Sequence, residues 1–151
     1  MDPLAYVIGQ EEAELKLLVT ALSQEMDILK AGHADPLENA VANKTRHIEA
    51  LARLGRQRNQ LLNAARLPDD REGLAQWARG SGHEALIQNF LALADEAREL
   101  NRLNGQLIAL RLNSTQAALA ALTPHRADEQ GLYGPKGQTR YTTGYRLIDT
   151  V

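Results

Sequence analysis

An apolar residue at every seventh position near the start of the chain limits the fold more than any other feature. The positions are Ile8, Leu15, Leu22 and Leu29. Residues seven apart lie on the same side of an α-helix, so this spacing predicts one long helix from Leu4 to Ala31 with a single apolar stripe. Lys30 and Gly32 are typical of a helix C-terminus, where a cation is favoured and glycine adopts the left-handed conformation.

Three later stretches carry a helix N-cap residue followed three positions on by glutamate. The pairs are Asp35 and Glu38, Asp69 and Glu72, and Ser81 and Glu84. This capping-box spacing predicts that three further helices begin there. The second helix is expected to end at Leu67 and Pro68, because proline disfavours the helical conformation of the residue before it. The third is short and carries the only tryptophan, Trp77, which we expect to pack over one end of the bundle.

The apolar stripe of the second helix is interrupted by Lys44, Gly55 and Arg58. Long basic side chains can cover apolar surface with their stems while their charged ends stay in water. We therefore expect Lys44 and Arg58 to pass over a loosely packed stretch and reach solvent.

The last helix, which runs to about Leu122, carries two apolar stripes in succession. The first comprises Leu86, Phe90, Leu93, Ala97, Leu100, Leu103 and Leu107. The second comprises Ile108, Leu112, Leu119 and Leu122, and we expect it to be rotated from the first. At ~1.5 Å per residue the helix would span nearly 60 Å, so it either bends or projects beyond its neighbours. The second stripe needs a partner, which is the first helix, a dimer mate or a client bound to an exposed patch.

The composition agrees with an all-α fold. Apolar residues make up 44% of the chain and aromatic residues only 4%, so the core must consist of Leu, Ile, Val and Ala, as in bundles. We predict a long-helix antiparallel bundle or hairpin of three long helices plus one short helix, with a flexible C-terminal tail. The helical domain is expected over residues 1–123 and the tail over 124–151.

The tail contains three of the four tyrosines, Tyr133, Tyr141 and Tyr145, among four glycines. Glycine raises the entropic cost of ordering a segment, whereas exposed tyrosines are good anchors for a partner. We therefore interpret the tail as a docking element that orders on binding. The alternative is a tail that folds back on its own bundle.

The sequence lacks the residues that several classes of function require. The net charge is −2 with acids and bases interspersed, which argues against nucleic acid binding. No two histidines have metal-site spacing, no residues suggest a catalytic nucleophile with its base, and the glycine-rich tail lacks the order of a phosphate loop. No apolar run of membrane-spanning length and no signal peptide is present. We expect a cytoplasmic binding protein with no catalytic residues, metal or cofactor.

Three stretches near the C-terminus resemble one known family. These are "ELNRLNGQLIAL" from Glu99 to Leu110, "LTPH" from Leu122 to His125, and "LYGPKGQT" from Leu132 to Thr139. They are similar to the C-terminal half of the FlgN family, which are flagellar type III export chaperones for hook-associated proteins. The resemblance covers roughly residues 99–139, and residues 140–151 match no element of the family.

The resemblance implies a function, a set of partners and a docking residue. The clients would be hook-associated proteins of the FlgK and FlgL type, held by their C-terminal amphipathic segments. The family's tyrosine contacts the cytoplasmic domain of the export gate protein FlhA, and Tyr133, between Leu132 and Gly134, is the residue that matches it. Together with the second stripe, this predicts client binding by Ile108, Leu112, Leu119 and Leu122. The alternative is a structural coiled-coil protein that forms a homodimer through its last helix and has no client.

Overall fold

The computed structural model describes residues 1–122, and these residues form four helices. Their bounds are Pro3–Ala31 for α1, Asp35–Ala64 for α2, Arg71–Ser81 for α3 and Glu84–Leu122 for α4. The prediction of three long helices and one short helix is confirmed. The predicted tail, residues 124–151, lies outside the described residues.

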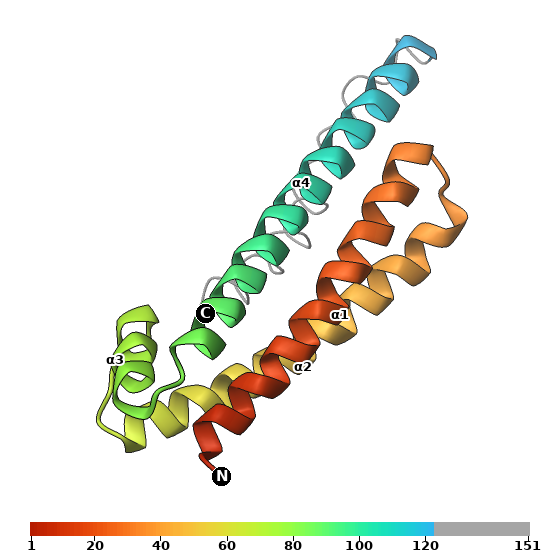
Figure 1. The fold of residues 1–151 in the computed structure, drawn as a ribbon. Coiled ribbons are helices and arrows are strands. Elements are labelled where there is room, and N and C mark those ends of the chain that lie inside the picture. The colour runs from red at the N-terminus through yellow and green to blue at the C-terminus, as the bar shows by residue number, and fades with distance from the viewer. Residues whose placement is uncertain (123–151) are drawn as a thin grey trace.

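The three long helices run up, down and up (Figure 1). Helix α1 lies in the centre and packs against both α2 and α4, while α2 runs antiparallel to them. The short helix α3 packs against α4 at the end of the bundle where α1 begins. This arrangement leaves α1 and α4 side by side and parallel, which fixes the relative height of their ends.

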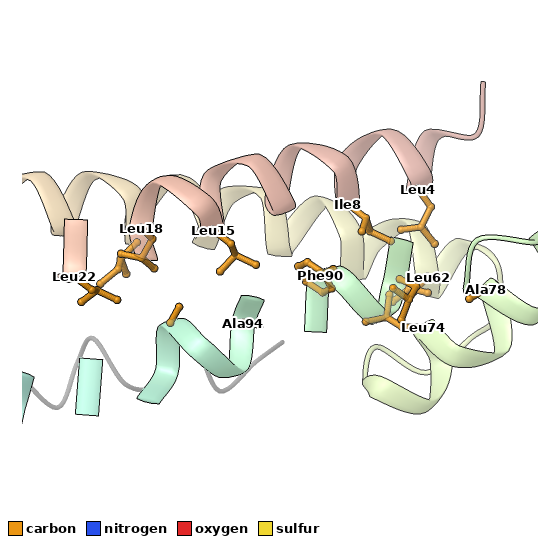
Figure 2. Close-up of a cluster of buried hydrophobic side chains, with 13 residues drawn as sticks. Leu4, Ile8, Leu15, Leu18, Leu22, Leu62, Leu74, Ala78, Phe90 and Ala94 are labelled. Carbon is orange, nitrogen blue, oxygen red and sulfur yellow. The ribbon is translucent and has the colours of Figure 1, made fainter. Parts of the chain in front are cut away.

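A continuous apolar core joins the four helices (Figure 2). Its fully buried members include Ile8, Leu15, Leu18, Leu22, Leu62, Leu74 and Phe90. The heptad positions predicted on α1 are all buried, and each such side chain contributes about 1.5–3 kcal/mol by leaving water. Trp77 is half-buried at the α3 end of the bundle, where its indole nitrogen donates to Asp2 Oδ2 at 3.2 Å, as expected for a residue that closes this end.

The helix starts differ from the predicted capping boxes. Helix α2 follows Ala34, which makes no side-chain capping bond, so Asp35 is already the first helical residue. Helix α3 is capped by Asp70, whose carboxylate accepts from the Gly73 nitrogen at 2.9 Å, and not by Asp69. Ser81 is the last residue of α3, and its hydroxyl donates to the Trp77 carbonyl at 2.8 Å instead of capping α4.

These differences have local causes. Gly82, at φ 73°, ends α3 in the left-handed conformation directly after Ser81, so the chain has already turned before α4 begins. At Gly73 a Cβ atom would lie 1.8 Å from the Pro68 carbonyl oxygen, so the tight turn into α3 accepts only glycine there. Helix α2 ends at Ala64, because Arg66 adopts φ 59° and the Leu67 nitrogen donates back to the Leu62 carbonyl at 2.9 Å.

Lys44 and Arg58 do not reach solvent, and the prediction that they would is wrong. Both are buried and each forms an ion pair with a buried glutamate of α1. Arg58 Nη1 lies 2.6 Å from Glu11 Oε1, and Lys44 Nζ lies 2.9 Å from Glu25 Oε2. Removing one member of either pair would leave the other charge in the interior without this counter-charge, so the pairs favour a single register between α1 and α2.

Burial dominates the acid–base properties of Glu11. It raises the pKa of the Glu11 carboxyl from 4.5 to about 7, although the Arg58 guanidinium acts in the opposite direction. The folded chain therefore holds this proton more tightly than the unfolded chain does. The resulting contribution to stability is present below the unfolded value and is lost as the pH rises through about 7.

A comparison with Glu11→Gln isolates this effect. Between about pH 5 and about pH 8, the free energy of unfolding of the wild type should fall by roughly 2–3 kcal/mol more than that of Glu11→Gln. The glutamine keeps an acceptor for Arg58 but does not titrate in this range. Urea unfolding at several pH values measures both curves, and parallel curves would contradict the assignment.

Candidate functional site

The candidate site lies on the C-terminal third of α4, and the face of α4 that packs in the core leads to it. The buried residues of that face are Ile87, Phe90, Ala94, Ala97, Asn101 and Asn104. They recur at three- and four-residue intervals, so they form one continuous stripe along the helix. The leucines predicted for this seam, among them Leu86, Leu93 and Leu100, are half-buried at its edge.

Asn101 and Asn104 are core residues in this arrangement. The Asn104 amide donates to the main-chain carbonyl of Leu22 at 2.9 Å, a contact between helices that run side by side. A buried polar group must be hydrogen-bonded to avoid a large desolvation cost, so this bond fixes the height of α4 along α1. The pattern of leucines could not reveal these positions, because asparagine and alanine do not stand out as core residues in a sequence.

The side chain of Arg111 reaches the end of α1, so α1 ends close to this part of α4. A Cβ atom on Gly32, the C-cap of α1, would lie 3.2 Å from the Arg111 guanidinium. Residues 112–122 therefore extend about 16 Å beyond this point, at ~1.5 Å per residue. Figure 1 shows α4 continuing past the ends of α1 and α2, so of the two alternatives for the long helix, the projecting end is confirmed. We call residues 112–122 the overhang.

The overhang presents apolar side chains to its surroundings. Leu112 is 37% exposed, Leu119 56% and Leu122 79%, while Ile108 at the base is half-buried. These four residues, which we call the distal apolar face, were all predicted from the sequence. Ile108 follows Asn104 by four residues and Leu112 follows Ile108 by four, so the distal apolar face continues the core face of α4. This stripe is rotated from most leucines of the first predicted stripe, but those leucines lie at the edge of the core face, so the expectation that they form the core seam is wrong.

Sequence reasoning missed Leu110, which is 65% exposed. It follows Ile108 by two residues, which places it about 200° round the helix from Ile108, on another side from the distal apolar face. It follows Leu107 by three residues and Leu103 by seven, so it continues the first predicted stripe, and this spacing could have identified it.

The overhang has no charge. Residues 112–122 read "LNSTQAALAAL", without an acidic or basic side chain. Such a surface offers apolar contacts and a few neutral hydrogen-bonding groups, and these are suited to another amphipathic helix.

The remaining predicted site residues, Leu132, Tyr133 and Gly134, lie outside the described residues. Within residues 1–122 the structure shows no group of acidic or histidine side chains that could hold a metal ion. None of the helices described in that range is long and apolar enough to cross a membrane.

Comparisons with known proteins agree over most of the chain. The family model for the FlgN protein matches residues 1–141. The Flagella synthesis protein FlgN of Salmonella typhimurium is 26% identical over 142 residues, which cover 92% of this chain and 91% of that protein. The protein of the same name from Escherichia coli K12 is 28% identical over 144 residues, which cover 94% of each.

A solved structure extends the comparison to three dimensions. The crystal structure of a protein described as a flagella synthesis protein FlgN, from Pseudomonas aeruginosa, superposes with a TM-score of 0.65 at 25% sequence identity. The match covers 72% of this chain and 88% of that chain. The resemblance found in residues 99–139 therefore extends through the first half of the sequence, and with a match over residues 1–141 this chain belongs to the FlgN family.

Proposed function

We propose that this protein is a cytoplasmic export chaperone for hook-associated proteins of the FlgK and FlgL type. It binds the terminal amphipathic segment of the client, prevents premature assembly and delivers the client to the flagellar export gate. The observation that carries the proposal is the overhang, in which the core face of α4 continues past the end of α1. The proposal involves binding alone, without a chemical step.

The geometry of the overhang suits a helical client. Below Arg111, the core face of α4 packs on α1, and above it the same face offers Leu112, Leu119 and Leu122. An amphipathic helix placed there would contact α4 much as α1 does lower down. Its apolar stripe would leave water at about 25 cal/mol per Å² of buried area, which is the main favourable term in helix-in-groove recognition.

Two features of the overhang support a reversible chaperone over a permanent complex. The exposed surface is short, at about three helical turns, and it carries no charge that could form a buried ion pair. The affinity should therefore depend little on ionic strength, in contrast to binding through charged side chains. A modest interface also allows the client to be released at the gate.

Delivery is assigned to Leu132, Tyr133 and Gly134 through the resemblance of the Leu-Tyr-Gly sequence to the family's gate-binding motif. Tyr133 follows Leu122, the last residue of α4, by eleven residues, so it is separate in sequence from the distal apolar face. A tyrosine ring can fill an apolar pocket while its hydroxyl keeps a hydrogen-bond partner. We infer a division of labour in which α4 holds the client and Tyr133 contacts the cytoplasmic domain of an FlhA-type gate protein.

Tyr133→Ala tests this division. Loss of a buried anchor typically costs about 2 kcal/mol or more, roughly thirtyfold in affinity. We expect this loss in binding to the cytoplasmic domain of the gate protein, with client affinity almost unchanged, and a smaller loss for Tyr133→Phe. Calorimetry with and without bound client measures both affinities. Equal weakening of client and gate binding would refute the division, and absence of gate binding by the client-loaded wild type would remove the docking role.

The second candidate is a structural protein that self-associates through its last helix. The same exposed leucines on the overhang favour it, because two copies of α4 could bury them against each other. Sedimentation velocity over a range of concentrations separates the candidates. A concentration-dependent dimer that does not bind a hook-associated protein would support this second function.

A further inference from the structure

A second apolar surface lies at the opposite end of the molecule from the overhang. The exposed large apolar side chains of residues 1–122 fall into two groups. One lies on α4 from Leu110 to Leu122, and the other comprises Met1, which precedes α1, and Tyr6 and Leu17 of α1. Beside Tyr6 is an open groove of about 590 Å³. The proposed function leaves this surface without a role.

Small residues of α1 form the floor of the groove, and larger side chains form its walls. Ala5, Gly9 and Ala13 lie at four-residue intervals on one side of α1, and Tyr6 and His83 also line the groove. A Cβ atom on Gly9 would have no atom within 4 Å, so the floor is open at this point. The groove is open to solvent along most of its length, so it suits a side chain that lies across the surface of α1.

Trp77 holds the walls of the groove in place. Its ring stacks on the His83 ring, with centroids 5.0 Å apart, and its indole nitrogen donates to Asp2 Oδ2 at 3.2 Å. Both His83 and Asp2 line the groove. The groove is therefore built before any partner arrives, and the only tryptophan of the chain is a natural reporter of its occupancy.

The apolar lining of the groove and the charge around it favour a partner segment that carries an aromatic side chain and basic residues. Its lining is mainly apolar, which suits a tyrosine ring. Asp2 is the one carboxylate among the lining residues, and no lysine or arginine lines the groove. A second copy of α1 would bring more carboxylates to this surface, whereas a basic segment would be attracted to it.

We propose that residues 136–148 of this chain dock in the groove, with Tyr141 and Tyr145 as the anchors. This segment reads "KGQTRYTTGYRLI" and contains three basic residues and no acidic residue. It supplies the aromatic side chains and the charge that the groove requires.

The length of the chain beyond α4 decides which tyrosines can reach. Asn104 contacts Leu22, so these two residues lie at about the same height in the bundle. Leu122 is eighteen residues above Asn104 and Gly9 is thirteen residues below Leu22, so Leu122 lies thirty-one helical residues above Gly9. That height is about 47 Å. Tyr133 follows Leu122 by eleven residues, which span at most about 40 Å when fully extended, whereas the twenty-three residues to Tyr145 span up to about 80 Å. The Cα atom of Tyr133 therefore stops short of the level of Gly9 even in a fully extended chain, whereas Tyr145 reaches the groove with slack.

Docking would therefore separate the roles of the tail tyrosines. Tyr141 and Tyr145 would fasten the end of the chain to α1, and Tyr133 would be carried on the loop between this anchor and α4. The inference gives a role to residues that extend past the end of the family match at residue 141. It requires neither client nor gate, so its test is independent of the proposed function.

A spin label on the full-length chain tests the proposal. The chain has no cysteine, so Thr143→Cys provides a unique attachment point between the two anchors. A nitroxide there should broaden the Trp77 indole N–H resonance until its signal is lost. The same label at Ala127→Cys, only five residues after Leu122, cannot reach the groove and should leave the signal intact.

Two variants and a mixing control locate the contact. Gly9→Leu fills the open floor of the groove and should restore the Trp77 signal, as should Tyr141→Ala combined with Tyr145→Ala. Ala92→Leu, the matched addition at an exposed position of α4, should leave the broadening in place. An undiminished Trp77 signal in the labelled chain would overturn the proposal. Broadening that survives Gly9→Leu would also overturn it and would point to another surface. Broadening of the unlabelled molecules in a mixture with labelled ones would overturn it as well and would point to a second copy.

Discussion

Replacing Glu11 with alanine is expected to lower the free energy of unfolding at neutral pH by about 3–5 kcal/mol, the usual cost of breaking a buried ion pair. The Arg58 guanidinium is 2% exposed, lies 2.6 Å from Glu11 Oε1 and sits 5.4 Å from the centroid of the Phe90 ring. Arginine does not lose its proton in proteins. In Glu11→Ala the Arg58 guanidinium therefore keeps its positive charge between three helices but loses the Glu11 carboxylate that lies beside it in the wild type.

The reverse substitution should cost much less. In Arg58→Met the buried Glu11 carboxyl can become neutral by taking up a proton, and its pKa is already raised to about 7. Glu11→Leu combined with Arg58→Met replaces the pair by apolar groups and should return close to wild-type stability or exceed it. Urea unfolding followed by circular dichroism measures the three variants. Equal costs for Glu11→Ala and Arg58→Met would show that lost packing, and not an unpaired charge, determines the effect.

The ion pairs also show which parts of the fold the sequence could predict. The heptad repeat of α1 gave a correct helix because residues seven apart share one face whatever the helix packs against. Glu11 and Arg58 are 47 residues apart, and Glu25 and Lys44 are 19 apart. Their pairing depends on the register between α1 and α2, which no local pattern contains, so solvated basic residues were the simpler interpretation.

The sequence predicted the residues of the candidate site but not their arrangement in the fold. Ile108, Leu112, Leu119 and Leu122 were identified by their spacing, and the structure places all four on one face near the C-terminal end of α4. The core face that leads to them runs through Phe90 and Ala97, which the first stripe included, and through Ala94, Asn101 and Asn104, which it left out. Because of this omission the predicted first stripe followed the edge of the core face, and the second stripe looked like a separate surface. The contacts of Asn104 with Leu22 and of Arg111 with the end of α1 show that α4 outruns α1, and no local pattern contains them.

Charging the overhang should abolish most of the client binding. Leu112→Asp combined with Leu122→Asp places two carboxylates on the surface that the client helix would bury. Each would lose its hydration without gaining a partner, because the overhang has no cation. We expect a loss of about 3 kcal/mol or more, at least a hundredfold in affinity.

The fold should tolerate this change, and the chain offers a matched control. Leu112 and Leu122 are 37% and 79% exposed, so neither is needed for the core. Leu17 on α1 is 53% exposed and lies far from the overhang, so Leu17→Asp makes the same chemical change on a different surface. Circular dichroism of both variants should match the wild type, and an unfolded double variant would mean that the overhang belongs to the core.

Titration calorimetry with the C-terminal segment of a purified FlgK-type protein tests the central proposal most directly. The segment should bind the wild type and Leu17→Asp with the same affinity, and its binding to Leu112→Asp with Leu122→Asp should be at least a hundredfold weaker. Equal affinity for all three proteins, or a loss confined to Leu17→Asp, would contradict client capture by the overhang of α4.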